Sequence, residues 1–149
     1  MASPEGMAPP DGIPPSLHAL IDTNVMLDLL LAREPWLSQA QPMWDARDAG
    51  LLVAYLPASV LTDIYYVCRK QVGTERAKQA VELCLNVIAV DRGIIATASA
   101  LSRNDFEDNV QIACAQSLGL DVIVTRDVVG FAHPPIPAVE PLAVIGHHS

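Results

Sequence analysis

The sequence is poor in aromatic residues and in charge, and each shortage excludes a class of protein. Phe, Trp and Tyr make up 5% of the 149 residues, so any core must be built from aliphatic side chains. Only 17% of the residues are charged while 51% are hydrophobic, which excludes a disordered chain. Such an aliphatic composition is typical of parallel strands that are buried on both faces. At this length, one domain with a sizeable core is expected.

Cysteine is also scarce, with three widely spaced residues. Cys68, Cys84 and Cys114 form neither a Cys-x-x-Cys pair nor a Cys/His spacing typical of zinc sites. Each falls in a helical pattern, where cysteine usually behaves as a small buried hydrophobe. Reduced thiols suit a cytoplasmic protein. The sequence shows no signal-peptide pattern and no apolar run long enough to span a bilayer, so we expect no membrane association.

Basic residues are outnumbered, with nine Lys and Arg against 17 Asp and Glu and a net charge of −8. Proteins bind nucleic acid largely by neutralising its phosphates with Lys and Arg, so the negative electrostatic field of this chain does not favour such binding. Binding to RNA would need local basic residues and a metal ion. The candidates are Arg69 and Lys70, in the one dense basic stretch, and Arg126. The alternative is that these side chains belong to ordinary solvated surfaces.

Proline and glycine mark the ends of the predicted domain. Residues 1–16 contain five prolines and two glycines, which predicts a flexible leader. We expect one domain over residues 17–144 and a disordered tail over residues 145–149.

Hydrophobic strands alternate with helical patterns through this domain. Strands are expected at residues 18–22, 51–56, 86–90, 122–125 and, weakly, 138–139. Ser59 and Asn104 are plausible N-caps of the helices over 59–71 and 104–118. The alternation predicts an α/β fold with a parallel sheet of four to five strands and right-handed crossovers. A strand order of 3-2-1-4-5 would place the ends of strands one and four side by side.

Four aspartates fall where this fold would bring them to one edge of the sheet. Asp22 ends the first strand, Asp127 follows the fourth, and Asp63 and Asp108 lie early in helices. In open α/β sheets, ligands bind beyond the carboxyl ends of the strands. Gathered carboxylates repel one another unless a cation neutralises them, and Mg²⁺ and Mn²⁺ prefer oxygen ligands. The pattern therefore predicts a Mg²⁺ or Mn²⁺ site.

Simpler interpretations exist for each acid. Asp22 could be a helix cap or turn former, and Asp63 a favourable charge in a first helical turn. Asp105 either shares the site or only caps its helix. We favour Asp108 as the ligand, since it lies on the helix face that carries Ile112 and Ala115.

Taken together, four segments resemble the PIN domain family, and among its members the bacterial VapC-type toxins. These segments are Ile21–Val25, Ser59–Tyr66, Asp105–Gln111 and Val124–Asp127. Each is unspecific alone, but all four occur in order and at domain-wide spacing. The resemblance covers nearly everything from residue 17 to 144.

The resemblance implies a three-layer α/β/α sandwich with Mg²⁺- or Mn²⁺-dependent nuclease activity, usually on RNA. Carried over by position, the four catalytic acids are Asp22, Asp63, Asp108 and Asp127. Asp22, Asp108 and Asp127 would hold the metal, and Asp63 would position or deprotonate the attacking water. The resemblance also implies the toxin of a toxin–antitoxin pair, with an antitoxin protein as partner and a homodimer as assembly.

Two further positions support this site in the family. Asn24 would brace the loop after the first strand, and Thr125 would line the pocket with its hydroxyl. The chain departs from the family at Asp63, where Glu is more usual. The shorter side chain leaves a rival hypothesis open, namely that the fold serves as a catalytically weak binding or scaffold module. An aspartyl-phosphate enzyme is disfavoured because Asn24 stands where a second Asp is needed.

Overall fold

The computed structural model describes residues 16–83, 86–103, 105–131 and 136–144. The expected leader up to residue 15 and the expected tail lie outside these ranges, as do Cys84 and Asn104. Ser16 is described, and its hydroxyl donates a hydrogen bond to the carbonyl oxygen of Gly50 at 2.8 Å. The elements follow in the order β1 (Leu17–Ile21), α1 (Thr23–Leu30), α2 (Trp36–Asp48), β2 (Leu52–Pro57), α3 (Ala58–Val72), α4 (Thr74–Glu82), β3 (Val87–Ile88), α5 (Arg92–Ala100), α6 (Phe106–Leu118), β4 (Val122–Val124), α7 (Val128–Phe131) and β5 (Ala138–Val139).

The five strands form one parallel sheet in the order β3-β2-β1-β4-β5, which confirms the predicted order. In this register Ile21 lies opposite Val124. The strands β1 and β4 therefore end side by side at the middle of the sheet. From this point the strand order proceeds outward in both directions, through β2 and β3 on one side and β4 and β5 on the other. Open α/β sheets form their ligand crevice at such a point.

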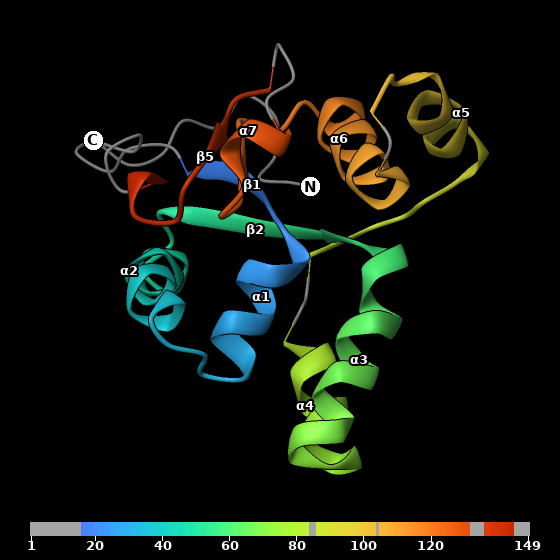
Figure 1. The fold of residues 1–149 in the computed structure, drawn as a ribbon. Coiled ribbons are helices and arrows are strands. Elements are labelled where there is room, and N and C mark those ends of the chain that lie inside the picture. The colour runs from blue at the N-terminus through green and yellow to red at the C-terminus, as the bar shows by residue number, and fades with distance from the viewer. Residues whose placement is uncertain (1–15, 84–85, 104, 132–135, 145–149) are drawn as a thin grey trace.

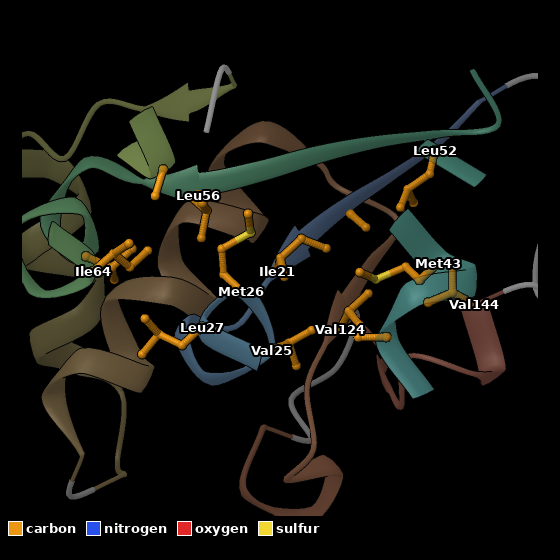
Figure 2. Packing of buried hydrophobic residues seen from close by; sticks show 14 of the residues in the cluster. Ile21, Val25, Met26, Leu27, Met43, Leu52, Leu56, Ile64, Val124 and Val144 are labelled. Carbon is orange, nitrogen blue, oxygen red and sulfur yellow. The ribbon is translucent and has the colours of Figure 1, made fainter. Parts of the chain in front are cut away.

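Side chains alternate across the sheet and are buried on both faces. Ala19 and Ile21 enter one hydrophobic cluster with α1, α2, α3 and α4, whereas Leu20 enters a second cluster with α5, α6 and α7. Figure 1 shows α1 and α2 on one side of the sheet and α5 and α6 on the other. Figure 2 shows the Met26 side chain beside those of Leu56 and Ile21 in the first cluster. This confirms the three-layer α/β/α architecture.

Two predicted helix starts are corrected by the structure. The helix α3 begins at Ala58 directly after β2, so Pro57, with an extended backbone, takes the N-cap position in place of Ser59. At the start of α6 the N-cap is Asp105, whose carboxylate accepts a hydrogen bond from the backbone N–H of Asp108. The short helix α7 was not anticipated. The helix α6 ends at Leu118, as predicted, and Gly119 follows it with a left-handed φ of 62°.

The cysteines that the structure describes are confirmed as small core residues. Cys68 and Cys114 are free thiols and are buried. Burial raises the pKa of the Cys114 thiol to about 11, which makes it a poor nucleophile. Within the described ranges, no helix has the length and apolar character needed to cross a bilayer.

Candidate functional site

Asp22 lies at the centre of the candidate site, at the carboxyl end of β1. It occupies the N-cap position of α1, but its side chain makes no capping hydrogen bond. Instead, Thr125 Oγ1 donates to its Oδ2 at 3.0 Å, and Gln111 Nε2 donates to its Oδ1 at 3.3 Å. The residue is only 7% exposed. A helix-capping role therefore does not account for this carboxylate.

Both side chains that donate hydrogen bonds to Asp22 are neutral. Burial raises the pKa of Asp22, and the hydrogen bonds from Thr125 and Gln111 lower it without cancelling the effect of burial. The charge of Arg126 also lowers this pKa, more weakly than either hydrogen bond. The ionised carboxylate is thus held in place but is not neutralised.

Asp108 brings a second carboxylate to this place from the first turn of α6. Its side chain is 19% exposed and forms an ion pair with Arg103, with Nη2 and Oδ2 3.2 Å apart. Burial, followed by the charges of Asp105 and Asp22, raises the pKa of Asp108 to about 6. Asp22 is therefore close enough to Asp108 for its charge to disfavour the ionised form of Asp108.

Glu107 adds a third carboxylate beside them. Its Oε1 accepts a hydrogen bond of 3.4 Å from Thr23 Oγ1, which follows Asp22 in the chain. Burial raises the pKa of Glu107, and the charges of Asp63, Asp105 and Asp22 raise it further. The exposed Asp63 of α3 thus faces the same region as the start of α6. Asp105 also lies there, with its Oδ1 engaged as the N-cap of α6 at 3.0 Å.

Asp127 is placed differently from the other predicted acids. Its Oδ1 accepts a hydrogen bond of 2.9 Å from the backbone N–H of Gly130 and caps α7. Its backbone N–H donates to Thr125 Oγ1 at 3.0 Å, so the link to Asp22 runs through Thr125 and not through the Asp127 carboxylate. Within the described ranges, no three His, Cys, Asp or Glu side chains form a group that could hold a metal ion.

The predicted basic contacts fall into two environments. Arg69 lies near the end of α3 with its guanidinium 5.5 Å from the centroid of the Tyr66 ring, and Lys70 beside it is exposed. Arg126 Nε lies 3.0 Å from Oδ2 of Asp28, and its guanidinium stacks 4.0 Å from the centroid of the Trp36 ring. Arg126 is thus engaged within the protein, whereas Lys70 is exposed to solvent.

Asp28 and Arg33, which the sequence analysis did not single out, lie beside Arg126 and the predicted Asn24. Asp28 is 1% exposed and pairs with Arg33 as well as Arg126, with Arg33 Nη2 3.1 Å from Oδ1. Asn24, the predicted brace, is exposed, and its backbone oxygen accepts a hydrogen bond of 3.4 Å from Arg33 Nη2.

Residues 18–129 match a protein-family model described as a PIN domain, which accounts for most of the chain. The chain belongs to the PIN domain family. No curated protein matches the sequence significantly.

Several solved structures share the fold of this PIN domain. A toxin–antitoxin complex from Klebsiella pneumoniae is 23% identical, with a TM-score of 0.65 over 83% of this chain and 97% of the other. A DNA-bound VapBC from Salmonella typhimurium is 19% identical, with a TM-score of 0.61 over 83% and 98%. VapC20 of Mycobacterium tuberculosis, described as a sarcin–ricin loop cleaving toxin, is 16% identical, with a TM-score of 0.58 over 70% and 86%.

Sequence reasoning missed two residues of the PIN domain site. Glu107 is not among the acids that the sequence pattern singles out. Gln111 was passed over, although a glutamine inside the apolar run from Val110 to Ala115 is a visible anomaly. A polar side chain in an otherwise apolar helix needs a hydrogen-bonding partner, and that requirement is the signal that could have pointed to Asp22.

The donor chemistry of the PIN domain fits a hard divalent cation. Asp22, Glu107 and Asp108 supply only oxygen atoms, and burial raises the pKa of each; neighbouring negative charge raises the pKa of Glu107 and Asp108 further. A cation bound among them would relieve both effects, because it stabilises the ionised forms. The amide oxygen of Gln111 is buried and has no hydrogen-bond partner, which adds a neutral oxygen to this surrounding.

Proposed function

We propose that this PIN domain is a metal-dependent endoribonuclease that hydrolyses phosphodiester bonds of RNA with Mg²⁺ or Mn²⁺. The observation that carries the proposal is the excess of negative charge where β1, α3 and α6 meet. Evidence for it is the raised pKa of Asp108, which the nearby Arg103 does not offset. Family membership supports a nuclease, and the description of VapC20 as a sarcin–ricin loop cleaving toxin supports RNA as the substrate.

Asp22 and Asp108 would hold the metal ion. Asp127, the third ligand expected from the family, accepts the hydrogen bond of Gly130 through Oδ1 and would offer its Oδ2 to the ion. When bound, such an ion lowers the pKa of a water molecule and stabilises charge on the phosphoryl and leaving oxygens. Thr125 would orient the Asp22 carboxylate by the hydrogen bond already present.

The remaining residues would handle water and substrate. Asp63 would position the attacking water or accept its proton, since it is exposed on the side of α3 that faces Glu107. Asp105 would keep Asp108 in place through its cap on the start of α6. Arg69 and Lys70 would bind RNA phosphates, because the acidic chain offers few other cations for this purpose.

The test is a time course on mixed single-stranded RNAs with Mn²⁺ or Mg²⁺, run with wild type and Asp127→Asn side by side. We expect slow cleavage by the wild type, because the net charge of −8 disfavours RNA binding. Chelation should stop it, and the variant should be inactive while remaining folded. Asp45→Asn, at an exposed position on α2, is the matched control and should cleave as the wild type does. Equal residual cleavage by wild type and Asp127→Asn would point to a contaminating nuclease.

As part of this proposal, the protein is the toxin of a toxin–antitoxin pair and forms a homodimer. The structural neighbours described as toxin–antitoxin complexes support an antitoxin partner. A hollow of about 360 Å³ between α3 and α4, lined by apolar side chains such as Leu61, Tyr65 and Val81, offers a surface for a protein partner. Co-purification with the product of the adjacent reading frame tests the pair, and light scattering tests the dimer.

One observation favours the rival function as a binding or scaffold module. The Asp127 carboxylate is already engaged within the protein, since its Oδ1 accepts the hydrogen bond of Gly130 that caps α7. A scaffold with a lapsed site should show no rise in melting temperature with Mn²⁺, whereas a nuclease should show one, since a ligand that binds only the folded state stabilises it.

A further inference from the structure

The helix α6 is buried over seven successive residues, and most of them are apolar or small. These residues are Asn109, Val110, Gln111, Ile112, Ala113, Cys114 and Ala115. Gln111 is 0% exposed and lies among the aliphatic side chains that fill this part of the core. A methionine or leucine would satisfy such a position without any buried polar atom. The glutamine therefore calls for a reason other than packing.

The amide group of Gln111 reaches the candidate site. Its Nε2 donates to Asp22 Oδ1 at 3.3 Å, while Thr125 Oγ1 donates to the other carboxylate oxygen at 3.0 Å. Chemistry fixes the orientation of the amide, because only the NH₂ end can donate to an ionised carboxylate. Both oxygens of Asp22 are thus held by neutral donors from two different elements, the helix α6 and the end of β4.

The other end of the same amide is unsatisfied. Gln111 Oε1 is buried and has no hydrogen-bond partner. Buried amide oxygens almost always accept at least one hydrogen bond, from the protein or from ordered water. Since the N–H end faces Asp22, the free oxygen lies next to the group that would hold the metal ion. Mg²⁺ and Mn²⁺ in such sites usually keep several of their water molecules, and each of these is a hydrogen-bond donor.

We propose that Gln111 is a positioning residue of the metal site, which holds the Asp22 carboxylate through its N–H and accepts a hydrogen bond from metal-bound water through its free oxygen. This inference rests on the proposed metal-dependent function. Partners of metal-binding carboxylates fix their orientation, and losing one typically weakens metal affinity about 10- to 100-fold. Gln111 would therefore act on the metal through Asp22 and through water.

The decisive variant is Gln111→Met, which keeps the length of the side chain and removes both polar ends. We expect the Kd for Mn²⁺, measured by calorimetry, to rise about tenfold. We also expect the metal-free variant to melt at the same temperature as the wild type or higher, because the substitution removes a buried acceptor that has no partner. A glutamine with a merely structural role would give the opposite pair of results, a lower melting temperature with an unchanged Kd.

Gln111→Glu separates the two ends of the amide. It keeps an oxygen at this position but replaces the N–H donor with a charge beside Asp22, so the metal-free protein should melt at a lower temperature. Added Mn²⁺ should raise its melting temperature by more than it raises that of the wild type. If Mn²⁺ raises the melting temperature of Gln111→Glu by no more than that of Gln111→Met, the role proposed for the oxygen is wrong.

Gln116→Met is the matched control, because it makes the same substitution on the same helix in a hollow lined by Asp91 and Thr97. Its Kd for Mn²⁺ should equal that of the wild type. If Gln111→Met also binds Mn²⁺ within twofold of the wild type, or fails to fold, the inference is wrong and the proposed function stands. If the wild type itself binds no Mn²⁺, both the inference about Gln111 and the proposed metal-dependent function are wrong.

Discussion

The ends of β1 and β4 lie side by side, yet the aspartates that follow them are used in different ways. Asp22 stands at the start of α1 and is buried, with its carboxylate held by Thr125 and Gln111. Asp127 stands just before α7, is exposed, and accepts a hydrogen bond from Gly130. Asp127 stabilises its own helix, as aspartates before helices commonly do. Asp22 leaves its helix uncapped by a side chain, and its carboxylate serves the site.

The largest expected effect comes from removing the charge at the end of β1. Asp22→Asn should lower RNA cleavage by on the order of 10²-fold or more, because it removes a charged oxygen ligand from the metal. The metal-free variant should be as stable as the wild type or more stable, since burial already disfavours the charged form. Cleavage assays and denaturant titration measure the two effects. An unchanged Mn²⁺ affinity would show that Asp22 is not a ligand.

The second expected effect concerns another buried aspartate of α1, which has cationic partners. Asp28→Asn should lower the free energy of unfolding by about 2–3 kcal/mol, because it leaves Arg33 and Arg126 without their shared partner. The side chains of both arginines are about one third exposed, so water limits the loss. Asp48→Asn, which breaks the exposed pair with Arg47, is the control and should cost less than about 1 kcal/mol. Equal losses would mean that the burial of Asp28 is unimportant.

A third, smaller effect should come from the end of β4. A Cβ on Gly130 would collide with the carboxylate of Asp127, so Gly130→Ala should break the cap of α7. We expect a loss of about 1 kcal/mol in the free energy of unfolding, as for other lost caps. The freed carboxylate should also bind Mn²⁺ more readily, which calorimetry measures. Weaker Mn²⁺ binding in this variant would indicate that the cap positions Asp127 for the metal.

The smallest effect is a dependence of stability on pH in the metal-free protein. The folded pKa of Asp108 is about 6, above its ordinary value of 3.8, so the folded state binds this proton more tightly than the unfolded state. Stability contributed by this group should therefore increase as the pH falls from about 7 toward 4. Asp22 and Glu107 shift in the same direction. Melting temperatures across this range measure the effect, and Asp108→Asn should flatten the dependence.

The sheet could be predicted because each strand is marked by a short hydrophobic run in the sequence itself. Aliphatic runs such as Val122–Val124 are buried on both faces, and their alternation with helices restricts the connections to one hand and one plausible order. The same reasoning predicts that Asp22, Asp63, Asp108 and Asp127 gather at one edge of the sheet. The charge of Asp22 raises the pKa of Asp108, which is consistent with that placement for these two residues.

The site was harder to predict where side-chain direction decides the outcome. Nothing in the order of residues distinguishes an Asp127 carboxylate that points toward Asp22 from one that caps the next turn. The cap depends on Gly130 and on the short helix α7, which the sequence pattern did not indicate. Gln111 escaped notice because its partner is 89 residues away in the chain.

The stacking of Arg126 on Trp36 gives this molecule a built-in optical probe. Indole emission responds to charge beside the ring, and the guanidinium lies 4.0 Å from the ring centroid of Trp36. Arg126 stands between Thr125 and Asp127, so any movement of that loop changes the surroundings of the indole. The chain has one other tryptophan, Trp44, and a Trp44→Phe variant would leave a single fluorophore. The wavelength of its fluorescence would then report on the loop after β4 in real time, without any added label.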